Sequence, residues 1–442
     1  MNVLAAAQLP FTAASCLIGP ARGAAQLARY RDRRVRALVA HAAACIPHYR
    51  ALWQRTGTCW QALRGTADLA ALPVTTKAML RRLSPDDVVD GRLDRATLLH
   101  HATSGSTGIP THIWRTHAEE RRLNLFRWRT LVRFGLRPGD RLAVVKLTTG
   151  GMPRGFDILQ RVMRGVGVVD RRAFDCFLPP EALQARLEAF RPQVLSGFAR
   201  SLVRLARSVP ASASASASGW APRVVVTGGE GISLAERELL RQRFDAPVHD
   251  IYGTTECNVM AFSCAETGAY HVCDDSVIVE VCRDGVPVAP GETGEVVVTS
   301  LHSWAMPLIR VAVGDRAIAG DDHCACGSRF STLQGIEGRV VDPFTVAGGR
   351  VVHPFELTNQ VLEAAAAWMA EFQIEQERED AFRVRVVGKH PVGTEALADL
   401  GRSLQRVLPA SVRVEVELAS ALARDPSGKL HYCRSLPATD AP

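Results

Sequence analysis

The stretch TSGSTGIPT, from Thr103 to Thr111, decides how the rest of the chain is interpreted. Its first six residues carry four hydroxyl side chains and two glycines. Glycine lets the backbone turn tightly and approach a ligand, so amides and hydroxyls can converge on one anion. The stretch has neither the GxxxxGK[ST] spacing of a P-loop nor the GxGxxG spacing of a dinucleotide loop. By itself it is either a phosphate-holding loop or an ordinary polar surface loop.

Four further motifs downstream favour the phosphate-holding loop. They are YGTTE (Tyr252–Glu256), IRVAVGD (Ile309–Asp315), GR (Gly338–Arg339) and PSGK (Pro426–Lys429). Together with the first stretch, their order and spacing resemble the adenylate-forming superfamily of acyl- and aryl-CoA ligases. The resemblance is strongest to its phenylacetate–CoA ligase and CapK-like branch, and it runs from about residue 30 to residue 432. It implies an enzyme that adenylates a carboxylic acid with ATP and passes the acyl group to a thiol.

Composition is typical of a multidomain globular enzyme. The chain has 442 residues, of which 47% are hydrophobic and 22% charged, enough for two or three folding units. No apolar run approaches the roughly 20 residues of a membrane span, and no basic residue precedes the apolar N-terminus, so we expect a cytoplasmic protein. The net charge is +8, but the arginines are dispersed, which argues against nucleic-acid binding. A basic surface would instead attract ATP, CoA or an acidic carrier protein.

Apolar periodicity predicts alternating strands and helices in the first two thirds of the chain. Strands are expected at 141–147, 165–170, 193–198 and 223–230, and helices at 116–134, 179–190 and 199–209. This alternation favours a largely parallel sheet, with ligands at the carboxyl ends of its strands. Short strands are then expected at 276–281, 294–301 and 306–313.

The resemblance implies an α/β fold with a large N-terminal adenylating domain, built on mixed or parallel sheets, and a small α+β C-terminal lid domain. We expect the first domain at 1–340, with a zinc-bearing β subdomain at about 257–340, and the lid at 341–442.

The resemblance also assigns the site residues. The residues expected at the nucleotide are Thr103, Ser104, Gly105, Ser106, Thr107, Gly108, Gly228, Gly229, Glu230, Tyr252, Gly253, Thr255, Asp315 and Arg339, and the catalytic residues are Lys429, Glu256 and Thr254. Residues 103–108 would hold the β and γ phosphates, and residues 228–230 would border the adenine.

Within the YGTTE motif, Tyr252 would stack on the adenine, Thr254 would contact the α-phosphate and Glu256 would bind magnesium, which prefers hard oxygen ligands. Asp315 would accept the ribose hydroxyls, and Arg339 would approach the ribose or the phosphates.

Lys429 would bridge the substrate carboxylate and the α-phosphate. Lysine occurs only at Lys77, Lys146, Lys389 and Lys429, so the choice of lysine over arginine in PSGK is itself a weak sign of a role.

The hinge after Gly338–Arg339 departs from the family pattern. An acidic pair is usual there, whereas Val340 and Val341 precede Asp342 in this chain. A β-branched valine tolerates fewer backbone angles than aspartate does. We expect either a slower lid rotation or a pivot at Asp342 or at the glycines of residues 348–349.

Eleven cysteines without a secretory signal favour free thiols or a metal over disulfides. Cys264, His271, Cys324 and Cys326 are candidate zinc ligands, although their spacing is not that of a standard zinc finger. The resemblance supports the same four residues, since relatives carry a cysteine, a histidine and a CxCG sequence here. A closed set of four soft ligands would make the zinc structural, and Cys273 and His323 are spare candidates.

The sequence does not identify the acceptor of the acyl group or the substrate acid. The acyl group could pass to CoA, to the phosphopantetheine of a carrier protein, or to an amine, and no stretch matches a substrate pattern. A catalytically silent, zinc-stabilised binding protein of the same fold is the competing hypothesis, motivated by the unusual hinge. Retention of Thr107, Glu256, Asp315 and Lys429 argues against it.

Overall fold

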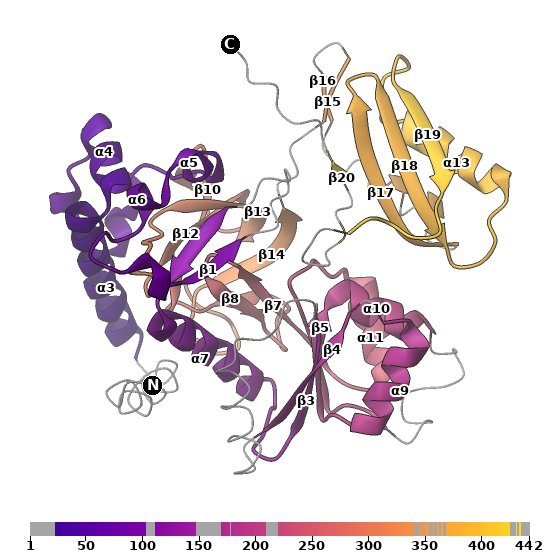
Figure 1. Ribbon diagram of the computed structural model, residues 1–442, viewed down its shortest axis with the longest axis horizontal. Helices are drawn as coiled ribbons and strands as arrows, with labels where there is room; N and C mark the ends of the chain where they lie inside the picture. Colours follow the sequence, from indigo (N-terminus) through magenta and orange to yellow (C-terminus); the bar gives the residue numbers. More distant parts are fainter. Residues whose placement is uncertain are drawn as a thin grey trace. The chain divides into compact units, whose positions relative to one another are not determined.

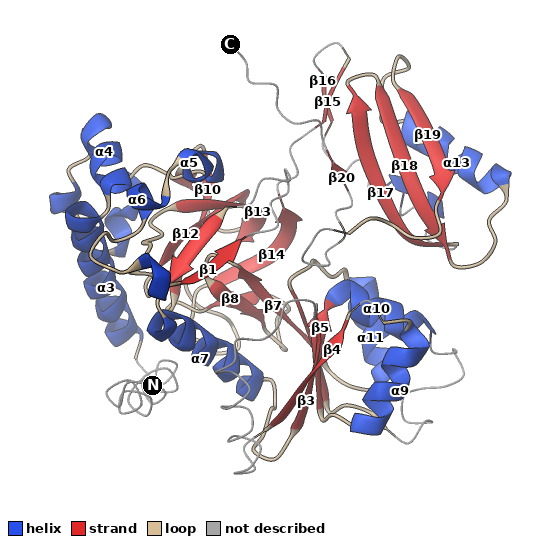
Figure 2. Cartoon of the chain, in the orientation of Figure 1, coloured by secondary structure: helices blue, strands red, loops and turns tan. Residues whose placement is uncertain are grey.

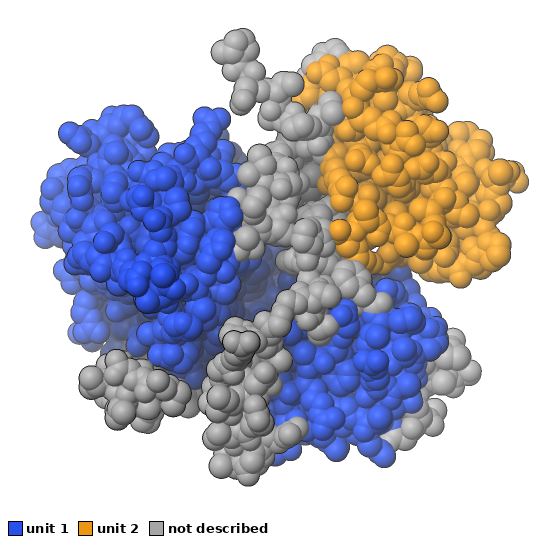
Figure 3. All heavy atoms as spheres, in the orientation of Figure 1, with its two compact units in different colours: residues 1–103, 111–338 blue, residues 104–110, 339–442 orange. Residues whose placement is uncertain are grey.

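The chain divides into two compact units, each with its own hydrophobic core. Unit 1 comprises residues 1–103 and 111–338, and unit 2 comprises residues 104–110 and 339–442 (Figure 3). The computed structural model describes residues 23–102, 111–146, 169–176, 178–208, 220–339, 344–347, 350–352, 357, 360–361, 364–365, 368–424, 430 and 433–434.

A run of parallel strands forms one half of the sheet of unit 1 (Figure 1). These strands are β3 (Arg141–Lys146), β4 (Asp170–Asp175), β5 (Val194–Phe198), β6 (Val224–Gly228) and β7 (Val248–Thr254), in the spatial order β7-β6-β5-β3-β4. The helices between them are α9 (Pro180–Phe190), α10 (Ala199–Ser208) and α11 (Leu234–Phe244). Ala143 and Val145 pack against these helices, while Leu142 and Val144 pack on the other face with residues of α7 (His117–Arg133). Side chains alternate between faces, so a strand buried on both is apolar throughout.

The other half of the sheet is antiparallel and continues from β7. Its strands are β8 (Asn258–Ser263), β9 (Tyr270–Val272), β10 (Val277–Arg283), β11 (Val286–Pro287), β12 (Thr293–Ser300), β13 (Val311–Ala319) and β14 (Thr332–Arg339). Within the described residues the whole sheet has 12 strands, in the order β11-β10-β12-β13-β14-β9-β8-β7-β6-β5-β3-β4. The sheet is therefore mixed, with β7 at the boundary between its parallel and antiparallel halves.

Two helices open the described chain. In α3 (Ala24–Cys45), residues Val35, Leu38, Val39 and Ala42 follow one another at intervals of three, one and three and are all buried. Pro47 starts α4 (Pro47–Arg55), because a first-turn residue needs no amide donor. The short elements that follow are η2 (Trp60–Ala62), η3 (Thr66–Ala71), α5 (Lys77–Arg82), α6 (Pro85–Val88), η4 (Arg95–Thr97) and the hairpin of β1 (Leu99–Ala102) with β2 (His112–Arg115).

Two predicted strands differ from the structure. The strand expected at 306–313 begins only at Val311, because Pro307 has no amide donor and Arg310 has a left-handed φ of 47°. The strand expected at 165–170 instead runs from Asp170 to Asp175, and residues 165–168 lie outside the described residues. Arg141, at the start of β3, pairs with Asp170, so the two parallel strands begin level with each other.

Unit 2 is a small α+β unit (Figure 2). Its sheet has the order β19-β18-β17-β20, formed by β17 (Met369–Arg378), β18 (Ala381–Gly388), β19 (Arg413–Leu418) and β20 (Cys433–Arg434). The hairpin of β15 (Phe344–Val346) and β16 (Arg350–Val352) and helix α13 (Thr394–Gln405) complete its described elements. Leu400 and Leu404 of α13, four residues apart and so on one helix face, join the core with Phe382 and Val384.

None of the helices described in either unit combines the length and the apolar character that a membrane crossing requires.

Candidate functional site

Residues 228–230, which are expected to border the adenine, and the YGTTE motif lie at the carboxyl ends of the neighbouring parallel strands β6 and β7. Gly228 ends β6 and is level with Ile251 of β7. A Cβ on Gly228 would lie 3.0 Å from the carbonyl oxygen of Ile251, and Gly229 has a φ of 77°. Both positions therefore need glycine, and they put the backbone of this segment beside β7. The Glu230 carboxylate accepts a hydrogen bond from the Arg200 amide at 3.0 Å.

Tyr252 and Asp315 are brought into direct contact. The Tyr252 hydroxyl donates to Oδ2 of Asp315 at 2.7 Å, and both side chains are buried. Burial and the neighbouring Asp315 carboxylate raise the pKa of Tyr252, so its hydroxyl stays protonated. Asp315 follows Gly314, whose φ of 76° turns the strand at this point. The residues expected at the adenine and at the ribose thus lie side by side.

The turn that ends the YGTTE motif is tightly constrained. Thr254 pairs with Asn258 across the β7–β8 hairpin, and Asn258 has a left-handed φ of 63°. A Cβ on Gly253 would lie 2.0 Å from the Asn258 carbonyl oxygen, so only glycine fits there. The hairpin therefore fixes the backbone that carries Thr255 and Glu256.

Arg115, which does not belong to the motif, forms hydrogen bonds to this turn. Its Nη2 donates to the carbonyl oxygens of Thr255 and of Glu256, the latter at 2.7 Å. Its Nη1 donates to Glu120 at 3.1 Å, and only 3% of the Arg115 side chain is exposed. We did not predict this residue, and no local pattern in the sequence marks it, because its partners lie 140 residues further along.

Glu256 is buried and forms an ion pair. Nζ of Lys77, the first residue of α5, lies 2.8 Å from its Oε1. Burial by itself would raise the pKa of Glu256, but the charge and hydrogen bond of Lys77 outweigh it and lower that pKa. The carboxylate is therefore ionised, as a magnesium ligand must be. The sequence offered one sign of Lys77, which is that it is one of four lysines in an arginine-rich chain.

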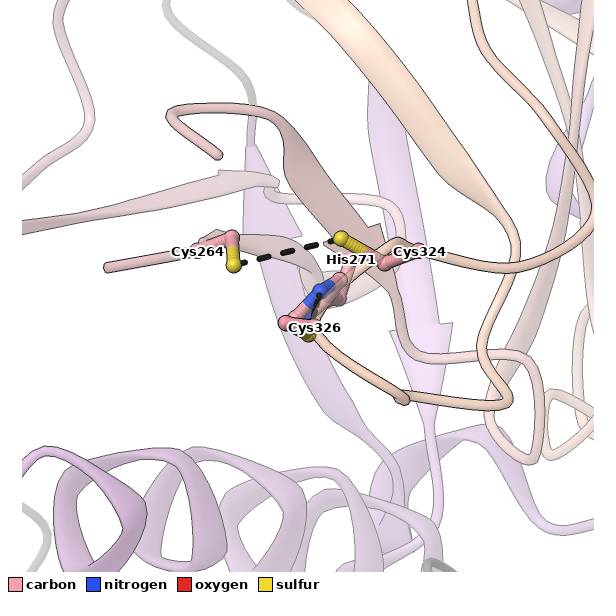
Figure 4. Close-up of side chains that lie close together, drawn as sticks. All are labelled: Cys264, His271, Cys324 and Cys326. Atoms are coloured by element: carbon pink, nitrogen blue, oxygen red, sulfur yellow. Dashed lines mark hydrogen bonds between the residues drawn. The ribbon is translucent and has the colours of Figure 1, made fainter. Parts of the chain in front are cut away.

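The four predicted zinc ligands converge (Figure 4). Their ligand atoms all lie within 4.8 Å of one another. Sγ of Cys264 is 3.9 Å from Sγ of Cys324, and Sγ of Cys326 is 3.4 Å from Nε2 of His271. A tetrahedral zinc with ordinary bond lengths would give separations of about 3.8 Å and about 3.5 Å. These two separations therefore match those of a tetrahedral zinc site.

Strand pairing explains how the cluster assembles. His271 lies in β9, between its partners Phe262 of β8 and Thr332 of β14. Cys264 follows β8, while the two other thiols lie in a turn just before β14, closed by a bond from the Gly327 amide to the Cys324 carbonyl at 3.0 Å. The spare candidates of the sequence analysis are not part of this cluster.

The protonation states of Cys264 and His271 suit a metal, whereas burial raises the pKa of Cys326 to about 11. Burial opposes ionisation of Cys264, but hydrogen bonds from Thr267 and the Glu266 amide outweigh it and lower the pKa of Cys264 to about 7. Burial lowers the pKa of His271 to about 4, which keeps the imidazole neutral. Thiolate and neutral imidazole are the forms that bind zinc.

Several predicted residues lie outside the described part of the chain. They are residues 103–108, Lys429 and the hinge residues 340–342 and 348–349. Arg339 ends β14, and only its backbone is described.

The described residues therefore define an α/β protein with an ionised, buried carboxylate, Glu256, just after β7 and an aromatic–carboxylate pair formed by Tyr252 of β7 and Asp315 of β13. This arrangement suits an enzyme that binds a nucleotide with a divalent cation. The chain belongs to the AMP-binding enzyme family, whose model matches residues 17–304.

Curated relatives agree with this family. The chain is 27% identical to the phenylacetate-coenzyme A ligase of Thermus thermophilus over 396 residues, which cover 85% of each protein. It is 26% identical to the ligase of that name from Escherichia coli over 358 residues, 76% of each protein.

Among solved structures, 2-hydroxyisobutyryl-CoA ligase in its postadenylation state with R3-HIB-AMP superposes with a TM-score of 0.69 at 22% identity, covering 90% of this chain and 87% of that one. An open form of the same ligase with 2-HIB-AMP and CoA superposes with a TM-score of 0.62 at 22% identity, covering 90% of this chain and 89% of that one. The predicted family, fold class and class of enzyme, an AMP-forming acid–thiol ligase, are confirmed.

Proposed function

We propose that this enzyme activates a carboxylic acid with ATP and then transfers the acyl group to coenzyme A. The observation that carries the proposal is the contact of Tyr252 with Asp315, together with the ionised Glu256 at the end of the YGTTE motif that contains Tyr252. In the first step a carboxylate oxygen attacks the α-phosphorus of ATP and pyrophosphate leaves. In the second step the CoA thiol loses its proton and attacks the acyl carbon, and AMP leaves.

The roles proposed for individual residues follow the resemblance. Residues 103–108 hold the β and γ phosphates, and Gly228, Gly229 and Glu230 border the adenine. Gly253, Thr254 and Thr255 contact the nucleotide, with Thr254 at the α-phosphate. Tyr252 stacks on the adenine, Asp315 accepts the ribose hydroxyls, and Arg339 approaches the ribose or phosphates.

Two residues, Glu256 and Lys429, contact the charged reactants directly in this proposal. Glu256 binds magnesium, which neutralises phosphate charge, and Lys429 bridges the substrate carboxylate and the α-phosphate. We assign residues 1–340 to the adenylating domain and residues 341–442 to a lid that brings Lys429 to the site. A group that meets developing charge accelerates the reaction far more than it improves ground-state binding.

We further propose that Cys264, His271, Cys324 and Cys326 hold one structural zinc ion. The match of their separations to a tetrahedral centre supports it. The four ligands leave no open coordination position, so this zinc would stabilise the β strands rather than act on the substrate. Elemental analysis of reduced, purified protein should find about one zinc per chain, and a value near zero would contradict the assignment.

Cytoplasmic localisation also stays a proposal. The described cysteines are free thiols, which is consistent with a reducing compartment.

The decisive experiment is a panel of aliphatic and aromatic carboxylates with magnesium and ATP, scored by pyrophosphate release. The preferred acid is then tested with CoA, with a phosphopantetheinylated carrier protein and with an amine. CoA-dependent thioester formation is expected, and dependence on either other acceptor would replace that part of the proposal. Pyrophosphate release with none of the acids would favour the catalytically silent binding protein.

Lys429→Ala is the test of the catalytic lysine, and Lys389→Ala, which removes an exposed lysine of the same unit, is its control. We expect Lys429→Ala to lower kcat by about 100-fold or more with little change in ATP affinity. Equal rates in the two variants would contradict the role of Lys429.

A further inference from the structure

Glu256 is paired with Lys77, a cation to which the proposed reaction assigns no role. Nζ of Lys77 lies 2.8 Å from Oε1 of Glu256, and the side chains are 20% and 2% exposed. Among the described residues, Lys77 is the cation whose charge most strongly favours the ionised form of Glu256. In the nucleotide-free protein, an ammonium group therefore neutralises the proposed magnesium ligand.

The position of Lys77 gives α5 no benefit. Lys77 is the first residue of the helix, where the helix dipole disfavours a positive charge. The helix start is already capped, since Oγ1 of Thr76 accepts a bond from the Met79 amide at 3.2 Å. A lysine at this position is accounted for by Glu256 and not by helix stability.

The backbone beneath Lys77 is fixed to the strand that carries Asp315. The amide of Thr75 donates to the Arg310 carbonyl at 2.9 Å, and the amide of Ala312 donates to the Thr75 carbonyl at 3.0 Å. These bonds dock the start of α5 against β13. The backbone is therefore held in place, and a change of partner would require movement of only the four-carbon side chain of Lys77.

Charge decides when magnesium can replace the ammonium group. A free magnesium ion would bring two positive charges to a carboxylate that is already neutralised, and the displaced ammonium would lose its partner. Magnesium that arrives with ATP brings phosphate oxygens, and these offer the ammonium a new anion. Magnesium typically binds through one or two carboxylates plus substrate phosphates, so such an exchange keeps every charge paired.

We propose that Lys77 exchanges partners on nucleotide binding: it occupies Glu256 in the free enzyme and moves to a phosphate oxygen of ATP when magnesium takes Glu256. This inference rests on the proposed function, because it assumes that Glu256 receives the magnesium of the nucleotide. It makes Lys77 a positioning residue for the triphosphate and makes metal binding dependent on nucleotide.

The choice of lysine fits an exchange. Arginine binds a carboxylate through a rigid two-pronged fork, whereas lysine is a compact charge on a flexible stem that can change partners. This chain uses arginine for nearly all its 53 basic residues, yet has lysine here.

The first test is metal binding without nucleotide, with Mn²⁺ as a paramagnetic probe of the magnesium position. Electron paramagnetic resonance would follow free Mn²⁺ during titration of the zinc-loaded wild type, Lys77→Gln and Arg82→Gln. The last variant removes the same charge from an exposed position of α5. Lys77→Gln should bind Mn²⁺ at least about tenfold more tightly than the other two, because an opposing charge is gone.

The second test is affinity for ATP with magnesium, measured by calorimetry. Lys77→Gln should bind it about tenfold or more weakly, since a charge-assisted bond to phosphate is lost. Adding Glu256→Gln to Lys77→Gln should remove the new Mn²⁺ site, which would assign that site to Glu256. Unchanged Mn²⁺ affinity in Lys77→Gln, or undiminished nucleotide affinity, would overturn the exchange.

Lys77→Arg keeps the inference testable if Lys77→Gln fails to fold. Its guanidinium should keep Glu256 neutralised, so no Mn²⁺ binds without nucleotide, while nucleotide affinity falls. Wild-type nucleotide affinity in Lys77→Arg would overturn the exchange. Neither test requires a carboxylic acid or turnover, so a failed ligase proposal, seen as no pyrophosphate release, is distinguishable from a failed exchange.

Discussion

Replacing Arg115 by methionine should loosen the YGTTE turn. The guanidinium donates to two carbonyl oxygens of that turn, those of Thr255 and Glu256, and it is buried. A hydrogen bond from a charged donor stabilises by about 1.5–3 kcal/mol, so losing both should cost about 3–6 kcal/mol locally. Methionine nearly fills the space of the arginine stem but offers no donor. The two carbonyls would then be left without this partner.

Amide hydrogen exchange measures this cost where it arises. A loss of about 3 kcal/mol should speed exchange in residues 252–258 by about 150-fold, unless global unfolding limits the rate first. The affinity for ATP with magnesium should fall as well, because Thr254 and Glu256 are carried by the loosened turn. Arg121→Met, at an exposed position of α7, should change both quantities little.

Wild-type exchange rates across residues 252–258 in a folded Arg115→Met protein would contradict this role of Arg115. That result would mean that the β7–β8 hairpin alone fixes the turn.

Three further predictions concern other contacts of unit 1. Tyr252→Phe removes the donor to Asp315 and should destabilise the protein by about 1.5–3 kcal/mol and raise the KM for ATP; an unchanged urea midpoint and KM would contradict the contact. Cys324→Ser should lower both the zinc content and the melting temperature, whereas Cys59→Ser, at an exposed thiol, should change neither. Burial opposes ionisation of Glu120, but a hydrogen bond from a neighbouring histidine and the charge of a neighbouring arginine outweigh it and lower its pKa to about 2. The pKa of Glu120 in the folded protein lies below its ordinary value of 4.5, so ionised Glu120 stabilises the fold above pH 4.5. This stabilisation, up to about 3 kcal/mol, is lost as the pH falls toward about 2. Glu120→Gln should therefore lose less stability than the wild type when urea unfolding is compared between about pH 5.5 and about pH 3, and equal losses would contradict the assignment.

Local patterns in the sequence determined much of the fold. The helix at α7 was predictable because Thr116 and Glu119 form a capping box ahead of periodic apolar residues, and the structure has this box. Strands β3 and β5 were predictable from their continuous apolar runs, which a strand buried on both faces requires. The YGTTE motif could be proposed as a site from the sequence because the residues concerned are five consecutive positions.

The four candidate zinc ligands could be predicted only in part. The residue types were visible in the sequence, but their spacing alone did not decide for a metal. Pairing of β9 with both β8 and β14 supports the proposed metal site, because that pairing brings His271 and the later cysteines together.

Only the tertiary structure revealed how the site is supported. Lys77 reaches Glu256 because Thr75 pairs with β13, and Arg115 reaches the same motif from the strand that precedes α7. Burial makes both contacts strong, since an ionised group away from water needs a partner. Sequence spacing carries no record of such a partner when the two residues are far apart in the chain and are joined only by the packing of the sheet.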